Sequence, residues 1–255
     1  MKQLLKKTLY QLTPSVIKQF YIHPVVEKLK NQQAEKLAFA QLCYAQEGED
    51  ILLNRYFDFK TSGYYVDVGA HHPQRFSNTY FFYKMGWRGI NIDAMPGSME
   101  PFYALRDRDI NLEMGVGEVA SSMDFYIFEE PALNTFNADR ADYLINKGCK
   151  MIEKRKVPVE TLENILDKHA PGQKIDFLTI DVEAMEIHIL RSMNWNRYRP
   201  GFVLLEDHTF DIETLSTNET YQFMYNQGYT FFGKAVNTVI YKLKDWCWLS
   251  GLIYA

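Results

Sequence analysis

Short apolar runs alternate with segments of helical periodicity between about residue 60 and residue 242. Apolar runs of this length, bounded by glycine or polar residues, predict buried β-strands. The segments between them, in which apolar residues recur every three or four positions, predict helices. Strands that alternate with helices imply an α/β fold with a parallel sheet covered on both faces. The predicted parallel strands are residues 64–68, 89–93, 110–114, 175–180 and 202–205, and residues 229–232 and 236–242 follow as an antiparallel hairpin.

A long excursion, at about residues 118–160, separates the third predicted strand from the fourth. It contains a strand pattern at 123–128 and a segment of small and polar residues at 132–136. In open α/β sheets such excursions often lie over the carboxyl ends of the strands, where ligands bind. A solvated β-hairpin explains the same pattern, so the sequence leaves both interpretations open.

The first 43 residues form a different kind of segment. Apolar residues at helical spacing, interrupted by Pro14 and Pro24, predict a helical extension that precedes a domain of residues 44–255. The formal net charge of −4 divides into +5 over residues 1–40, with seven lysines and two glutamates, and −9 over the remaining chain. A basic amphipathic segment suits an anionic membrane surface, but it could also pack on the domain or on a second subunit of a homo-oligomer.

Composition limits the class of protein further. The chain is 47% hydrophobic and 24% charged, which is typical of a globular protein with one large core. Its three cysteines, Cys43, Cys149 and Cys247, are scattered, so a reducing compartment is expected and a disulfide framework or zinc ribbon is not. No apolar run reaches the roughly 20 residues that span a bilayer, and the first residues lack a secretory signal pattern. We therefore expect a cytoplasmic protein that does not bind nucleic acid, and the basic segment leaves open a location peripheral to the inner face of a membrane.

Acidic residues occur at the ends of three predicted strands: Asp67, Asp93 and Asp181. The carboxyl ends of parallel strands form the ligand edge of such a sheet, so all three are expected beside a ligand. After the first strand stands the single glycine Gly69, instead of the three-glycine pattern that binds a pyrophosphate. Asp93, at the next strand end, is placed to accept hydrogen bonds from a ribose. A ribose without a pyrophosphate indicates S-adenosylmethionine, although helix capping explains the acids as well.

An ordered set of motifs resembles the FkbM family of S-adenosylmethionine-dependent methyltransferases. The motifs are residues 65–73 (YVDVGAHHP), 77–79 (SNT), 86–94 (GWRGINIDA), 96–98 (PGS) and 180–183 (IDVE), with AQEGED upstream at 45–50. The resemblance covers about residues 44–242 and implies the seven-stranded class I methyltransferase fold, which is Rossmann-like. The chain departs from the family pattern at Ala45, where serine is common, and at Ala184, where glycine is common.

The resemblance also implies where the cofactor would bind. Gln46, Gly69, Ala70 and His71 would hold the methionine part of S-adenosylmethionine, and Asn78 would border it. Asp93 would take the ribose. Ala94, Met95 and Val116 would flank the adenine.

Methylation of a hydroxyl requires that its proton be removed or that the developing alkoxide be stabilised. Asp181 ends one strand, and Glu206 and Asp207 end the next, so three carboxylates are predicted to meet and to bind Mg²⁺. The pattern resembles metal-dependent macrolide-sugar O-methyltransferases. The same acids could instead only shape the pocket. Asp181 and His208 are the predicted catalytic residues, with His208 as the base because it lies beside the acidic pair.

The predicted function is O-methylation of a small-molecule or glycan acceptor: a sugar, a nucleotide-linked sugar or a surface glycan in polysaccharide biosynthesis. Two alternatives remain open at this point. One is an N-methyltransferase that acts on an amino sugar or a protein side chain. The other is a non-catalytic scaffold that docks a glycan-assembly complex through residues 1–40.

Overall fold

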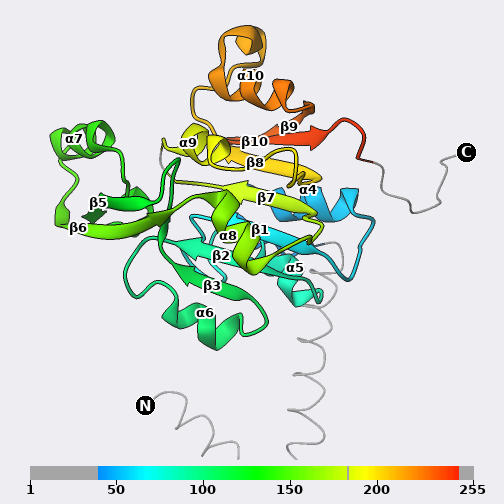
Figure 1. Ribbon diagram of the computed structural model, residues 1–255, viewed down its shortest axis with the longest axis horizontal. Coiled ribbons are helices and arrows are strands. Elements are labelled where there is room, and N and C mark those ends of the chain that lie inside the picture. The colour runs from blue at the N-terminus through cyan, green and yellow to red at the C-terminus, as the bar shows by residue number, and fades with distance from the viewer. Residues whose placement is uncertain (1–39, 183, 247–255) are drawn as a thin grey trace, which may run out of the picture. The chain divides into compact units, whose positions relative to one another are not determined.

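A seven-stranded sheet organises the computed structural model, which describes residues 40–182 and 184–246 (Figure 1). The strand order is β3-β2-β1-β7-β8-β10-β9, and β10 runs antiparallel to both of its neighbours while the other pairs are parallel. This arrangement confirms the predicted α/β fold with its antiparallel C-terminal hairpin. The strands are β1 (Tyr64–Val68), β2 (Arg88–Asp93), β3 (Ile110–Glu113), β7 (Phe177–Ile180), β8 (Phe202–Glu206), β9 (Tyr229–Ala235) and β10 (Thr238–Leu243).

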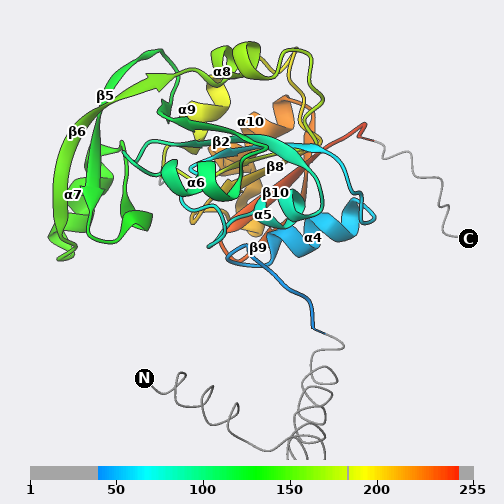
Figure 2. The ribbon, with the colours of Figure 1, turned by 90° about the horizontal axis from the view of Figure 1, so that it is seen from below.

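Helices cover both faces of this sheet (Figure 2). One face packs against α8 (Leu162–His169), α9 (Glu186–Arg191) and α10 (Glu219–Asn226), where Val66 and Val68 of β1 join the same core cluster. The other face packs against α4 (Glu49–Tyr56) and α5 (Tyr80–Lys84), with α6 (Glu100–Leu105) beside them. Since strand side chains alternate between faces, a strand of this kind is apolar at nearly every position, which is why the sequence shows continuous apolar runs.

The insertion between β3 and β7 forms a small sheet of its own, with strand order β4-β6-β5. Its elements are β4 (Gly115–Val116), β5 (Ser121–Phe128), the 3₁₀ turn η2 (Pro131–Leu133), α7 (Ala138–Asn146) and β6 (Met151–Glu160). Strands β5 and β6 pair antiparallel along their length, and they project to one side of the main sheet in Figures 1 and 2. A second 3₁₀ segment, η3 (Ile212–Thr217), precedes α10.

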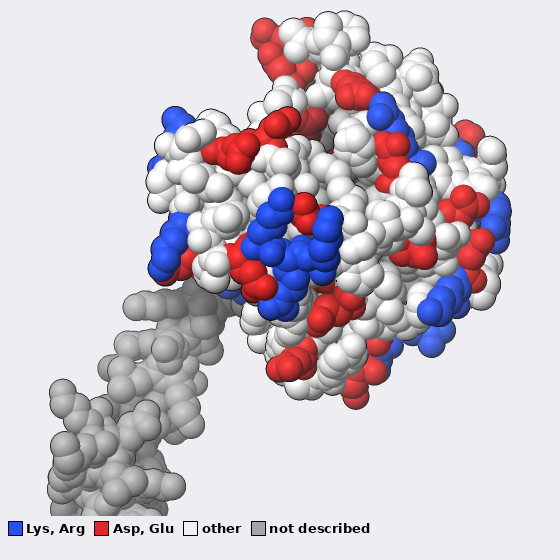
Figure 3. Space-filling view, turned by 60° about the vertical axis from the view of Figure 1, so that its left-hand side comes forward, with Lys and Arg blue, Asp and Glu red and all other residues white. Residues whose placement is uncertain are grey.

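Charges on the insertion are largely paired with one another. Lys154 and Lys156 both contact the carboxylate of Asp124, each at 2.9 Å, and Arg155 contacts Glu153 at 2.8 Å. Figure 3 shows basic side chains gathered beside acidic ones on this side of the molecule. Exposed pairs of this kind contribute little to stability because water and salt screen them, but they neutralise the basic run of β6.

Two compact units divide the chain, Met1–Leu42 and Cys43–Ala255. The predicted helical extension of residues 1–43 lies almost entirely outside the described residues and stays a prediction. Among the residues that the structure describes, no helix is long and apolar enough to cross a membrane.

Candidate active site

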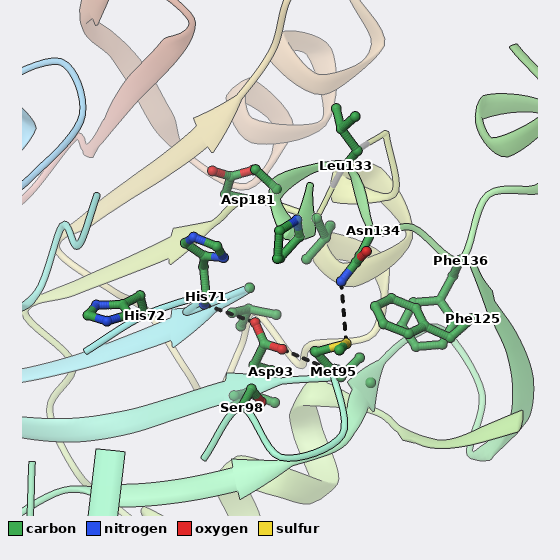
Figure 4. A pocket seen from close by; sticks show the side chains of 18 of the residues that line it. His71, His72, Asp93, Met95, Ser98, Phe125, Leu133, Asn134, Phe136 and Asp181 are labelled. Carbon is green, nitrogen blue, oxygen red and sulfur yellow. Dashed lines mark hydrogen bonds between the residues drawn. The ribbon is translucent and has the colours of Figure 1, made fainter. Parts of the chain in front are cut away.

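A cavity of about 680 Å³ opens at the carboxyl ends of the central strands (Figure 4). The strand ends form one wall and the insertion forms the other, so the structure favours the interpretation of residues 118–160 as a ligand wall. The sequence-predicted site residues that line the cavity are Gln46, Gly69, His71, Asp93, Ala94, Met95, Val116, Asp181, Glu206 and His208. Asn78 lines a smaller cavity beside it, together with Gln46 and Asp181.

Gly69 forms the turn that leaves β1. Its φ of +82° lies in the left-handed region, and a Cβ at this position would stand 1.8 Å from the carbonyl oxygen of Asp181. Its amide N–H donates to the carbonyl of Ile92 at 2.9 Å, which fixes the turn against β2. Glycine is required here for both conformation and space, and the turn therefore presents bare backbone to the cavity.

Asp93 ends β2 with its carboxylate held by backbone amides. One oxygen accepts the N–H of His71 at 2.9 Å and the other accepts the N–H of Met95 at 2.8 Å. Burial raises the pKa of Asp93, and these two N–H groups oppose that rise because they stabilise the charged form. A carboxylate has about four lone-pair positions, so it can accept two further hydrogen bonds from a ligand.

The insertion supplies an apolar wall near Met95. The rings of Phe125 and Phe136 lie 4.6 Å apart and pack with Met95 in one cluster. Asn134 contacts the Met95 sulfur at 3.5 Å through its amide nitrogen, and its amide oxygen accepts the N–H of Phe128 at 2.8 Å. Sequence reasoning singled out the segment 132–136 but not the pairing of Phe136 with Phe125, which depends on how the insertion folds.

Gln46 is positioned by the acidic residues that follow it. Glu47 accepts the backbone N–H of Asn237 at 2.7 Å and that of Thr238 at 3.3 Å, and Glu49 accepts the Thr238 hydroxyl at 2.6 Å. These bonds tie the segment before α4 to the start of β10. Glu47 and Glu49 therefore fix the segment that carries Gln46 at the cavity.

The structure does not bring all three predicted magnesium ligands together. Asp181 and Glu206 line the cavity, but Asp207 does not; its carboxylate accepts the Thr209 N–H at 2.8 Å and the Asn218 amide at 2.9 Å. Consecutive residues at a strand end face opposite sides, so Glu206 and Asp207 cannot both face the cavity. Within residues 40–182 and 184–246, no group of three or more His, Cys, Asp or Glu side chains is arranged to hold a metal ion.

His208 lies beside Glu206, with 3.4 Å between its Nε2 and a glutamate oxygen, and half of its side chain is exposed. His188, seven residues after Asp181, is a second histidine near these strand ends in the sequence. It lies outside the cavity lining and contacts Glu118 at 2.6 Å on the surface. The structure thus brings His208, Glu206 and Asp181 to one cavity and separates His188 from them.

Two further predicted cofactor contacts, Asp67 and Ala70, do not line the cavity. Ala70 is buried against α6. Asp67 faces the α5 side of the sheet, where it accepts the Thr79 hydroxyl at 2.7 Å, and Thr79 in turn accepts a hydrogen bond from the fully buried Arg106. Side chains of β1 alternate between the two faces of the sheet, and Val66 and Val68 occupy the face opposite to that of Asp67. Asp67 therefore points toward α5 and not toward the cavity at the Gly69 turn.

Asp67 makes the stability of the protein depend on pH. Burial raises the pKa of Asp67 from its ordinary 3.8 to about 6. The folded state therefore binds a proton on the Asp67 carboxylate more tightly than the unfolded state does. The contribution of Asp67 to stability is fully present below about pH 4 and is lost as the pH rises through about 6. Relative to Asp67→Asn, which does not titrate, we expect the free energy of unfolding of the wild type to fall by about 2–3 kcal/mol between pH 4 and pH 7. Urea unfolding of both proteins across this range measures the difference, and a constant difference would refute the prediction.

The strand order and the position of the cavity define a Rossmann-like methyltransferase fold. The family described as "Methyltransferase FkbM domain" matches residues 67–231. The chain belongs to this FkbM family of S-adenosylmethionine-dependent methyltransferases, which confirms the family and the enzyme class predicted from the motifs.

Solved structures that are similar to the chain include two methyltransferases. One is the methyltransferase FkbM from Methylobacillus flagellatus KT, 14% identical with a TM-score of 0.45 over 71% of this chain and 44% of that one. The chain thus spans less than half the length of that protein. The other is a TehB-like SAM-dependent methyltransferase from Corynebacterium glutamicum ATCC 13032 Kitasato, 10% identical with a TM-score of 0.40 over 87% of this chain and 100% of that one. No curated protein sequence matches the chain.

The cavity suits the cofactor of this family. Gly69 lets the turn after β1 pass close to the backbone of Asp181 without a side chain, and Asp93 keeps acceptor positions for a ribose diol. The Phe125 and Phe136 rings offer an apolar surface for a purine. The residues present therefore fit S-adenosylmethionine, with the ribose at Asp93 and the purine beside Met95, as the resemblance implies.

Proposed function

We propose that this chain methylates a hydroxyl group of a sugar, a nucleotide-linked sugar or a surface glycan, as a step in polysaccharide biosynthesis. The observation that carries the proposal is the pairing of His208 with Glu206 in the cavity that also contains Asp93. When bound, S-adenosylmethionine supplies an electrophilic methyl group. A hydroxyl acceptor then needs a residue that removes its proton, and an amine that enters unprotonated needs none before it is methylated.

His208 is suited to take that proton. Histidine is the side chain most often used as a general base, and the exposed ring of His208 faces a cavity into which an acceptor can enter. Glu206 lies 3.4 Å from Nε2, so its carboxylate stabilises the imidazolium that forms after proton transfer. Asp181, on the neighbouring strand end, provides a further carboxylate that can orient the hydroxyl of the acceptor.

Replacement of His208 by glutamine tests this role. We expect kcat for methyl transfer to a hydroxyl acceptor to fall about a hundredfold, because a positioned base contributes roughly 10²–10⁴-fold. The dissociation constant of S-adenosylhomocysteine should stay unchanged, since His208 is proposed to serve the acceptor. The measurement is a methyl-transfer assay over a panel of sugars, nucleotide sugars and amino sugars, with calorimetry for the product cofactor.

His188→Gln is the matched control, because His188 lies beside a glutamate on the surface and outside the cavity lining. It should retain wild-type turnover. Failure of the wild type to bind S-adenosylhomocysteine would overturn the proposed function, and transfer to amino groups alone would overturn the assignment to hydroxyl acceptors.

A further inference from the structure

The loop that follows the cofactor turn, residues 71–76, holds His72 in a defined protonation form. Nδ1 of His72 accepts the backbone N–H of Gln74 at 3.1 Å and that of Arg75 at 2.9 Å. A nitrogen that accepts hydrogen bonds carries a lone pair, so the ring proton is on Nε2. Burial and the nearby His71 and Arg75 lower the pKa of His72, which agrees with a neutral ring. His72 therefore presents an N–H donor on the edge of the ring that faces away from its own loop.

Arg75 is held beside it. Its guanidinium stacks on the ring of Phe76, with 4.4 Å between the guanidinium carbon and the ring centroid, and both residues line the cavity at its exposed rim. Stacking leaves the edge of the guanidinium, with its N–H donors, open to a ligand. Within the described part of the chain, no carboxylate forms an ion pair with Arg75. Phe76 has a φ of +58°, a left-handed conformation that is rare for an aromatic residue.

The position of this loop separates it from the apolar wall of the cavity. Figure 4 shows His72 on the opposite side from Phe125 and Phe136, and set apart from Asp181 with His71 between them. The half-buried Gly69 and Asp93 lie deeper than the exposed Arg75 and Phe76. The rim is therefore accessible to a molecule that enters beside the cofactor, as the methyl acceptor must.

We propose that Arg75 and His72 bind a phosphate group of the methyl acceptor, so that the substrate is a phosphorylated or nucleotide-linked sugar. This inference rests on the function proposed above and narrows its substrate class. The guanidinium supplies a positive charge and two parallel N–H donors, and Nε2–H of His72 supplies a third donor. Together these groups can bind several oxygens of one phosphate. A neutral glycan would leave both groups without an anionic partner.

The test is calorimetric titration of the full chain, saturated with S-adenosylhomocysteine, using inorganic phosphate, glucose 1-phosphate and methyl glucoside as probes. We expect glucose 1-phosphate to bind at least tenfold more tightly than methyl glucoside. Arg75→Gln should weaken binding of both phosphate probes at least tenfold, and Arg75→Lys should restore part of the loss. Arg155→Gln, on the outer face of the insertion, is the matched control and should leave every affinity unchanged.

Each other outcome overturns the inference. If Arg75→Gln leaves the phosphate affinities unchanged while S-adenosylhomocysteine still binds, the loop does not recognise the acceptor, but the proposed function survives. If Arg75→Gln weakens S-adenosylhomocysteine and not 5′-methylthioadenosine, which lacks the amino-acid part, the anion is the carboxylate of the cofactor. If the wild type does not bind S-adenosylhomocysteine at all, the proposed function and the acceptor site fall together.

Discussion

Replacement of Asp93 by alanine is expected to lower the affinity for S-adenosylhomocysteine about a thousandfold. Asp93 has acceptor positions for both hydroxyls of a ribose, and a hydrogen bond to a charged group contributes roughly 1.5–3 kcal/mol. Two such bonds amount to about 4 kcal/mol, which corresponds to about a thousandfold in the dissociation constant. The substitution also frees the backbone amides of His71 and Met95, which the carboxylate now holds at 2.9 and 2.8 Å.

Calorimetry with S-adenosylhomocysteine measures the change, and two further variants define its origin. Asp93→Asn should also bind weakly, because one of its two terminal groups is a donor and would face the N–H of His71 or Met95. Asp124→Ala removes an acid on the insertion that contacts Lys154 and Lys156, and it should bind like the wild type. An Asp93→Ala protein that kept its affinity would show that the ribose is bound elsewhere.

Replacement of Gly69 by alanine is expected to abolish cofactor binding and to lower Tm by about 10 °C. An L-residue at a φ of +82° costs about 1–2 kcal/mol. The added methyl group would also stand 1.8 Å from the backbone oxygen of Asp181, so either the turn or the end of β7 must move. A total cost of about 3 kcal/mol corresponds to roughly 10 °C for a domain of this size.

The matched control for this variant is Gly148→Ala. Gly148 has a φ of +88°, but a Cβ there would meet no atom within 4 Å. It carries the conformational cost alone, so Tm should fall by only about 2–5 °C, with S-adenosylhomocysteine binding unchanged. Thermal unfolding and calorimetry of both variants separate the two effects. If Tm and S-adenosylhomocysteine affinity fell equally in the two proteins, the contact with Asp181 would not limit which residue fits at position 69.

The sheet could be predicted because its signal is local. A strand such as Tyr64–Val68, buried on both faces, is apolar at nearly every position, and glycine or acid marks where it ends. The same reasoning located Asp93, because parallel strands bring their carboxyl ends to one edge. What it could not supply is the side of the sheet that a given residue faces, since a shift of one residue reverses it.

Two residues were predicted at the cavity but lie elsewhere, because the sequence does not show which face of the sheet a side chain is on. Asp67 lies one position before the last residue of β1 and faces α5, and Asp207 lies one position past the end of β8 and faces α10. Both were grouped with cavity residues by their nearness in sequence. The Phe125 and Phe136 pair was missed for a different reason, because the contact depends on the pairing of β5 with β6 and on the path of the chain through η2.

The insertion can change in sequence during evolution more easily than the main sheet can. It forms the cavity wall beside Met95, yet it contributes no strand to the seven-stranded sheet. Substitutions or changes of length within 118–160 can therefore reshape that wall without disturbing the pairing of β1, β2 and β7. The sheet edge that holds Asp93 and Gly69 is under strict geometric constraint, and on the insertion the same constraint applies to Phe125 and Phe136, which face the proposed purine site beside Met95. Changes elsewhere in the insertion can therefore accumulate while the cofactor site is preserved.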